Sequence, residues 1–221
     1  MPYYSFYKEY FPFWNSLSED DRKKLCENTT EEFFEKEQPL HGNMQCSGLY
    51  IVQTGRLRIY ILSEDGKEIT LYRLNPGDFC MLSASCVLQS ITFEVFVEAE
   101  APGTCYRISA SAFGDLTERY PQVKIFALET AVERFSDVMW VMQQILFMSM
   151  DKRLAIFLLE ESQMTKSDTV SLTHDRIARH LGTAREVVSR VLKHLSADGI
   201  IDASRKEITI IDKKRLQKIA Y

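Results

Sequence analysis

Residues 173–210 read THDRIARHLGTAREVVSRVLKHLSADGIIDASRKEITI, and this stretch decides the fold of the last third of the chain. At helical spacing, its second half has one apolar face, made of Val188, Val191, Leu192 and Leu195. The opposite face carries an acceptor, a hydroxyl, a guanidinium and an ammonium in one row: Glu186, Ser189, Arg190 and Lys193. Such groups suit the base edges and phosphates of a DNA major groove, so the pattern predicts a recognition helix.

The flanking residues predict a winged helix-turn-helix around this recognition helix. Thr173 is expected to cap a first, short helix, and Gly182 permits the tight turn that follows it. Thr183 is the expected N-cap of the second helix, and Gly199 is a natural stop. The remaining residues then form a β-hairpin whose tip carries two cations, Arg205 and Lys206.

Several of these side chains have a second interpretation. Glu186 stands three residues after the expected N-cap, so it completes a capping box or contacts cytosine, and the two interpretations have equal weight. Arg185 and Arg190 beside a serine favour DNA over a solvated surface, whereas Arg205 and Lys206 suit either a phosphate contact or a solvated loop.

Three histidines lie in the same region, and their spacing favours phosphate neighbours or surface groups over metal ligands. No two of them are four residues apart, as a helical metal site requires. They are His174, His180 and His194.

Charge is distributed unevenly along the 221 residues, although the net charge is only -4. Residues 1–150 carry 13 Lys and Arg against 21 Asp and Glu, whereas residues 151–221 carry 14 against 10. An acidic body joined to a basic end is consistent with one module for a signal and another for a polyanion.

Composition also bears on location. No apolar run approaches the length that spans a bilayer, and the first 14 residues, eight of them aromatic, lack a basic start followed by an apolar core. We therefore expect no membrane segment and no secretory signal. An odd number of cysteines argues against a disulfide framework and for a reducing cytoplasm: Cys26, Cys46, Cys80, Cys86 and Cys105.

Short apolar runs separated by glycine turns extend from Phe33 to Ile108 and predict an antiparallel barrel or sandwich. Turns are expected at Thr54-Gly55, Glu64-Asp65-Gly66 and Asn75-Pro76-Gly77-Asp78. The expected strands are Leu49–Val52, Leu57–Ile61, Ile69–Tyr72, Phe93–Val97 and Thr104–Ile108.

Pro121 begins a long helical pattern with an apolar residue at alternating steps of three and four. One interpretation is a helix packed on its own barrel, and the other is a self-associating coiled coil, which the strict period favours. Ala131, Val138 and Val141 are among the neighbours that widen the apolar face toward the barrel, and a buried helix follows at Leu154–Leu159. The seam comprises Ile125, Leu128, Val132, Phe135, Met139, Met142 and Leu146.

Taken together, these motifs resemble the CRP/FNR transcription regulators. The DNA-binding part is similar through Leu181-Gly182, Arg185-Glu186-x-x-Ser189-Arg190 and Gly199-Ile200-Ile201. The upstream part is similar through Leu49-Tyr50-Ile51-Val52-x-x-Gly55, Asp65-Gly66-Lys67-Glu68 and Pro76-Gly77-Asp78-Phe79. The Glu-x-x-Ser-Arg form looks more like the fumarate–nitrate branch than the cyclic-AMP branch.

The resemblance implies an α+β protein in three parts. They are a cyclic-nucleotide-binding-type β-roll (jelly roll) over residues 1–120, a dimerisation helix over 121–150, and a winged helix-turn-helix over 151–221. It implies a cytoplasmic homodimer that reads palindromic double-stranded DNA, with Arg185, Glu186, Ser189 and Arg190 at the contacting positions. A contact with RNA polymerase is a further implication.

The same resemblance argues against cyclic AMP as the effector. Cyclic-nucleotide members hold the phosphate with an Arg followed by Ser or Thr, and by similarity those places fall near Phe93 and Glu94. A carboxylate there would repel the phosphate. A small organic effector in an apolar β-roll pocket is the default. The candidate pocket residues are Tyr72, Phe79, Cys80, Met81, Cys86 and Phe93.

Cys80 and Cys86 have three interpretations: small buried hydrophobes, a thiol redox pair, or ligands of a metal or iron–sulfur cluster. Iron–sulfur members of the family carry a tight cysteine cluster at the amino terminus, which this sequence lacks. Haem through His41 or a cysteine is a further, weaker candidate.

A rival function of another class is a cyclic-nucleotide- or metabolite-binding regulatory subunit with no DNA role. Such a subunit does not need a basic wing or two exposed arginines. We expect no enzymatic activity, because the sequence shows no nucleophile–base pair, metal box or phosphate loop.

Overall fold

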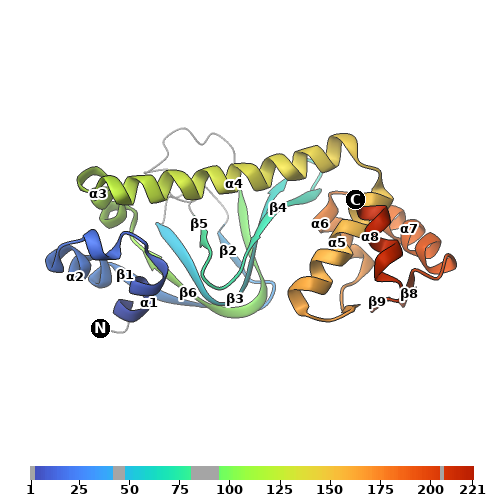
Figure 1. Cartoon of the computed structure of the whole chain (residues 1–221), viewed down its shortest axis with the longest axis horizontal. Coiled ribbons are helices and arrows are strands. Elements are labelled where there is room, and N and C mark those ends of the chain that lie inside the picture. Colours follow the sequence, from blue (N-terminus) through green and yellow to red (C-terminus); the bar gives the residue numbers. More distant parts are fainter. Residues whose placement is uncertain (1–2, 42–47, 81–94, 205–206) are drawn as a thin grey trace. The chain divides into compact units, whose positions relative to one another are not determined.

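The computed structural model describes residues 3–41, 48–80, 95–204 and 207–221 (Figure 1). The chain divides into two units, residues 1–61 with 71–138 and residues 62–70 with 139–221. Both units mix helices and strands, which confirms the expected α+β class.

The first unit begins with helices whose aromatic residues form a core of their own. These are α1 (Tyr3–Tyr10), the 3₁₀ turn η1 (Trp14–Ser16) and α2 (Glu19–Glu27). Tyr7, Phe11 and Trp14 are buried, and the rings of Tyr7 and Phe11 stack with their centroids 5.0 Å apart. The aromatic residues near the start of the chain therefore form part of the hydrophobic core of the first unit.

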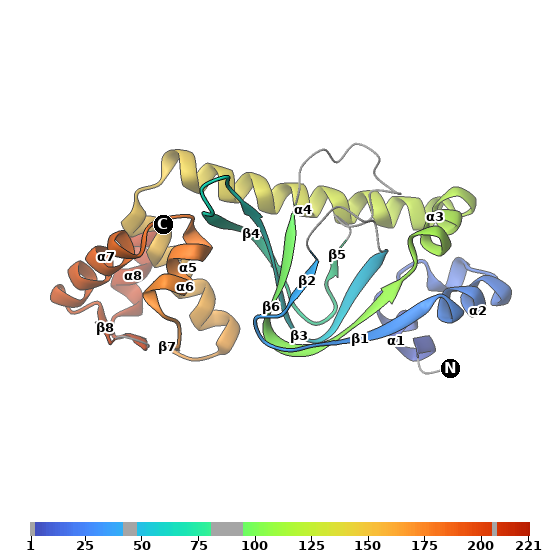
Figure 2. The ribbon, with the colours of Figure 1, turned by 180° about the vertical axis from the view of Figure 1, so that it is seen from behind.

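The larger sheet, most of which lies in the first unit, is antiparallel in its described pairings. It comprises β1 (Thr29–Phe34), β2 (Pro39–His41), β3 (Leu49–Leu62), β4 (Glu68–Leu74), β5 (Phe79–Cys80) and β6 (Phe96–Ile108). The order is β1-β6-β3-β4, with β2 also on β6 and β5 also on β3. Figure 2 shows β3 and β6 running side by side and curving together. This curved sheet is the expected β-roll.

One expected turn is wrong. Thr54-Gly55 does not separate two strands, because β3 runs continuously and only its register with β6 shifts between Val52 and Leu57. Gly55 has φ +80°, and a Cβ on it would lie 2.6 Å from the carbonyl oxygen of Pro102. The glycine therefore serves a bulge that lets two backbones approach closely.

The other two expected turns are confirmed. The amide of Gly66 donates to the carbonyl of Ser63 at 2.9 Å between β3 and β4. The amide of Asp78 donates to the carbonyl of Asn75 at 2.9 Å before β5. The expected strands Phe93–Val97 and Thr104–Ile108 fall on the single strand β6, although residues 93 and 94 lie outside the described part of the chain.

Two helices follow the sheet, α3 (Ala110–Arg119) and α4 (Pro121–Phe147), and the predicted start of the long helix at Pro121 is confirmed. Val123, Phe126 and Ala127 of α4 are buried in the aromatic core. Every residue of the predicted seam is instead exposed, by 43% to 64%. The interpretation that the seam packs on its own barrel is therefore wrong: a different face of α4 does so.

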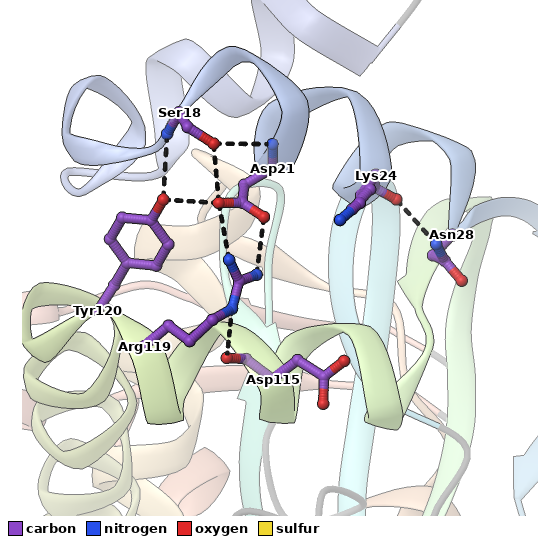
Figure 3. A network of polar contacts seen from close by, with 7 residues as sticks. All are labelled: Ser18, Asp21, Lys24, Asn28, Asp115, Arg119 and Tyr120. Carbon is purple, nitrogen blue, oxygen red and sulfur yellow. Dashed lines mark hydrogen bonds and ion pairs between the residues drawn. The ribbon is translucent and has the colours of Figure 1, made fainter.

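A polar network joins α2 to the end of α3 (Figure 3). Ser18 caps α2, with its Oγ accepting from the backbone amide of Asp21 at 3.1 Å. The buried Asp21 carboxylate accepts two hydrogen bonds from Arg119, at 2.7 and 2.9 Å, and one from Tyr120 at 2.6 Å. Arg119 and then Tyr120 hold the pKa of Asp21 well below its usual range.

The second unit is built around α5 (Met150–Thr165), whose residues Leu154–Leu159 are buried, as the sequence predicts. The other helices are α6 (His174–Leu181), α7 (Arg185–Ala197) and α8 (Lys213–Ala220). A three-stranded sheet in the order β7-β9-β8 completes it, from β7 (Thr169–Val170), β8 (Ile201–Ala203) and β9 (Ile208–Ile210).

Helix α8 was not expected from the sequence. Asp212 caps it, with its Oδ1 accepting from the amide of Arg215 at 2.9 Å. Leu216 and Ala220 are buried in the core of the second unit. The signal was present as a capping aspartate followed by apolar residues four apart, but the helix is short.

Arg153 links α5 to the end of α6. Its Nη2 donates to the backbone carbonyl of Leu181 at 2.5 Å, and burial lowers the pKa of the guanidinium. The last carbonyls of a helix lack intrahelical donors, so this bond satisfies one of them and anchors the turn that precedes α7.

Asp21→Asn is expected to lower the free energy of unfolding at neutral pH by about 1–3 kcal/mol, because a buried charge-assisted network is broken. A carboxyl with a depressed pKa stabilises the fold above its unfolded pKa of about 4 and loses that contribution as pH falls below it. Urea unfolding at neutral pH and at about pH 3 checks this, since the difference from wild type should shrink in acid. The control is Asp20→Asn on the exposed side of α2; equal losses in both variants would refute the role of the network.

Arg153→Ala is expected to lower the free energy of unfolding by about 1.5–3 kcal/mol, because the carbonyl of Leu181 loses its charged donor. Chemical denaturation followed by circular dichroism measures the loss. Lys152→Ala removes a neighbouring cation that forms no ion pair in the described part of the chain, and should change stability by no more than about 0.5 kcal/mol. Similar values for the two variants would contradict the assignment.

Candidate DNA-binding interface

Helix α6 and its turn set the position of α7. Thr173 caps α6 as predicted, with its Oγ1 accepting from the amide of Arg176 at 3.2 Å. Ile177, Ala178 and Leu181 are buried. Gly182 ends the helix in the left-handed region, at φ +62°, where glycine is the favoured residue. The chain can therefore reverse within a few residues and enter α7.

Both faces expected of the recognition helix are present in α7. Its apolar residues, from Val188 to Leu195, are no more than 5% exposed. The opposite face is turned to solvent, and Ser189 lies partly buried at its centre. The exposed members of the polar row are Glu186, Arg190 and Lys193, and Arg185 beside the row is exposed as well. The structure thus gathers five predicted DNA-contacting side chains on one helix.

The start of α7 corrects one prediction. Its N-cap is Ala184, which offers no side-chain acceptor, and not Thr183. Glu186 is consequently the second residue of the helix, and the capping-box interpretation is wrong. A carboxylate in the first turn still interacts favourably with the helix dipole. Because its carboxylate does not take part in a capping box, the exposed Glu186 is available to contact a binding partner.

The wing is a short hairpin between β8 and β9. Its loop is closed by Ser204, whose amide donates to the carbonyl of Glu207 at 2.8 Å and whose Oγ accepts from the amide of Glu207 at 3.1 Å. Arg205 and Lys206, predicted at the tip, lie outside the described residues.

The three histidines differ in their surroundings. His194 is a surface group, with Asp151 and Asp198 at 3.7 and 3.8 Å. His180 is only 5% exposed, and the centre of its ring lies 5.3 Å from that of Phe157, so the prediction of a surface or phosphate role is wrong for it. Among the described residues, no group of three or more His, Cys, Asp or Glu could hold a metal ion.

His174 makes a contact that the sequence did not reveal. Its Nδ1 lies 2.7 Å from Oγ of Ser189, across 15 residues of chain. Both residues line an open groove of about 380 Å³ together with side chains of α7 and the wing: Leu192, Lys193, Ser196, Ala197 and Ala203. A groove that holds the polar groups of His174, Ser189 and Lys193 beside an exposed charged face is suited to a sugar–phosphate backbone.

The first unit holds the described members of the candidate effector pocket. Tyr72 is buried, which raises its pKa, and its hydroxyl has no hydrogen-bond partner among the described residues. The guanidinium of Arg134 lies 5.1 Å from the centre of its ring. Phe79 instead packs in the aromatic core, against Phe11 and Phe126. Met81, Cys86, Phe93 and Glu94, with the side chain of His41, lie outside the described part.

The described cysteines are buried thiols: Cys26, Cys80 and Cys105. Burial raises the pKa of Cys105 to about 12, which disfavours the thiolate that redox chemistry or metal binding requires. Cys80 is only 2% exposed in the apolar core of the same sheet, which favours its interpretation as a small packing residue, whereas Cys86 lies outside the described residues.

Across the ranges that the structure covers, no helix has both the length and the apolar character needed to cross a membrane. Exposed apolar side chains on α4 are interrupted by charged residues such as Glu129, Glu133 and Asp137.

Comparison with known proteins agrees with this architecture. A family model described as a Crp-like helix-turn-helix domain matches residues 152–219, and one described as a cyclic nucleotide-binding domain matches residues 31–120. The two matches do not overlap, and together they cover most of the chain.

Relatives extend the similarity over the full length. A crystal structure from Eubacterium rectale, assigned to the CRP/FNR family of transcriptional regulators, shares 43% identity over 96% of this chain and 99% of its own, with a TM-score of 0.91. The probable transcriptional regulator flp of Lacticaseibacillus casei is 27% identical over 95% of this chain and 96% of its own. The cAMP-activated global transcriptional regulator CRP of Pasteurella multocida is 25% identical over 77% and 84%.

The rival interpretation, a regulatory subunit without a DNA role, does not account for the helix-turn-helix match. The chain belongs to the CRP/FNR family of DNA-binding transcription regulators.

Proposed function

We propose that the protein binds a palindromic double-stranded DNA site as a homodimer, under the control of an effector held by its β-roll. The observation that carries this proposal is α7, whose apolar face is buried while four charged side chains are exposed beside an open groove. The three functional parts would be those expected from the sequence, residues 1–120, 121–150 and 151–221. Its place of action would be the cytoplasm, and contact with RNA polymerase is part of the same proposal.

Each exposed side chain of α7 suits a distinct role on DNA. Arg185 and Arg190 can make bidentate contacts with guanine or with phosphate. Glu186 can accept from the amino group of cytosine, and Lys193 can pair with phosphate. Thr183, in the turn, and the wing residues Arg205 and Lys206 would add contacts to the backbone.

The exposed seam of α4 supports the homodimer. Seven large apolar side chains along one helical face leave a contiguous apolar stripe, which soluble monomers seldom present. Their alternating spacing of three and four residues is that of a coiled coil, so a second copy of the same helix is the fitting partner. Such a dimer would present two recognition helices to major grooves about 34 Å apart.

The effector proposal rests on the polar groups around Tyr72. A buried phenol whose hydroxyl has no partner among the described residues is costly unless a ligand supplies one. Arg134 comes from α4, so a molecule bound near Tyr72 would act on the helix that we propose to form the dimer. A small organic effector fits this arrangement, and differential affinity for two states would couple it to DNA binding.

Arg190→Ala is expected to weaken DNA binding and to relax sequence preference, by roughly 1–3 kcal/mol per half-site, because a direct contact on α7 is lost. Gel-shift titration on a duplex selected by the wild-type protein measures both effects. Lys218→Ala removes one exposed charge from α8 and serves as the matched control, with a smaller loss and unchanged preference. Unaltered affinity and preference in the arginine variant would refute the assignment of α7.

Phe135→Asp is expected to convert the dimer to a monomer, because a carboxylate would be buried in the seam without a partner. In the single chain Phe135 is 64% exposed, so the fold should tolerate the change. Analytical ultracentrifugation gives the mass of the species in solution. Glu133→Gln alters a charge of α4 outside the seam and should leave the dimer intact; a variant at Phe135 that stays dimeric would rule out this interface.

A further inference from the structure

The hydroxyl of Ser189 is already engaged before any DNA is present. Its Oγ lies 2.7 Å from Nδ1 of His174, the first residue of α6. A serine within a helix commonly bonds a carbonyl of its own preceding turn. Here its described partner comes from a different helix, so the contact holds the side chain in one orientation on the recognition face.

The direction of this hydrogen bond decides what Ser189 can read. A free hydroxyl both donates and accepts, so a serine alone discriminates poorly between base edges. If Nδ1 accepts, the hydroxyl hydrogen is used and only lone pairs face outward. If Nδ1–H donates, the hydroxyl keeps its hydrogen for another acceptor.

The other ring nitrogen of His174 indicates which tautomer is present. Nε2 is buried and has no hydrogen-bond partner among the described residues. A neutral imidazole carries one hydrogen, on either nitrogen. A buried N–H without an acceptor is rarer in proteins than a buried acceptor without a donor. We therefore assign the hydrogen to Nδ1, where Ser189 accepts it.

We propose that His174 is a positioning residue that sets the sequence preference of the recognition helix. Its Nδ1–H donates to Oγ of Ser189, and the serine hydroxyl is left to donate to DNA. Ser189 then prefers acceptor edges, namely guanine O6 and N7, adenine N7 or thymine O4, over the amino groups of cytosine and adenine. This inference rests on the proposed function, since it requires α7 to face DNA.

The groove around the pair agrees with such a donor. His174 and Ser189 share it with Lys193, whose ammonium can only donate. Two donors four residues apart on α7 lie on the same side of the helix. They would present one edge of hydrogen-bond donors to a DNA surface rich in acceptors.

The test uses the full-length protein and a duplex selected by it from a library with a randomised central segment. Affinities are measured for that duplex and for a panel with each base pair substituted in turn. Ser189→Ala identifies the base pair that Ser189 reads. His174→Ala should then lower discrimination at that same base pair by roughly five-fold, with little change elsewhere.

Two isosteric variants determine the direction of the bond. His174→Asn keeps an N–H donor near the place of Nδ1–H and should restore discrimination. His174→Asp offers only acceptors, so it should draw the serine hydrogen to itself and move the preference toward a base pair that presents an amino group. Its negative charge weakens binding to every duplex, so ratios between duplexes are compared. Asparagine and aspartate are both tolerated near the start of a helix.

The outcomes separate the inference from the proposed function. If Ser189→Ala relaxes discrimination while Ala, Asn and Asp at position 174 all leave it unchanged, the role of His174 is refuted and the DNA interface stands. If neither Ser189→Ala nor Arg190→Ala alters binding, the interface itself is refuted. Equal discrimination ratios for His174→Asn and His174→Asp would overturn the tautomer assignment, because the two side chains have the same shape and the ratios cancel the uniform effect of the aspartate charge.

Discussion

The burial of one face of α7 is the constraint on which the functional surface depends. Val188, Val191, Leu192 and Leu195 can leave water only by packing into the core of the second unit, which α5 dominates. A straight helix that buries one side must expose the other, so the polar row from Glu186 to Lys193 is turned outward by the same packing. The turn at Gly182 and the bond from Arg153 to Leu181 then limit the directions in which α7 can project.

Helix α4 also buries one apolar face, but unlike α7 it has a second apolar face, which is exposed. One face, with Val123, Phe126 and Ala127, is satisfied within the first unit. The other, the seam, is 43% to 64% exposed in the described chain. An apolar stripe of that length is costly in water, which is why we assign it a second copy of the helix. A group on the buried side, such as Arg134, could then transmit the presence of a ligand to the dimer.

The position of the hydrogen between His174 and Ser189 affects which base edges the serine can contact, and the positions of the heavy atoms alone do not give it. The contact between His174 and Ser189 involves two groups that can each donate or accept. We infer the direction of this hydrogen bond from the surroundings of Nε2, which has no partner among the described residues. That direction determines whether the Ser189 hydroxyl donates to DNA or accepts from it. Residues outside the reading helix can in this way influence what it reads.

Local patterns in the sequence were sufficient for much of this protein. The two faces of α7, the cap at Thr173, the turns around Gly66 and Gly77, and the start of α4 at Pro121 all follow from periodicity and backbone preferences within a few residues. The motifs of the family depend on the same short-range rules, so the winged helix-turn-helix and the β-roll were both predictable.

What depends on distant partners was decided only by the tertiary structure. Gly55 forms a bulge and not a turn because Pro102 lies opposite it. His180 is buried because the packing of α5 covers it with Phe157, and His174 meets Ser189 because the turn brings α6 and α7 together. The outward orientation of the α4 seam likewise depends on residues that are distant in the sequence. Sequence periodicity determined that an apolar stripe exists, whereas the choice of the face that packs inward required the volumes of side chains contributed by other elements.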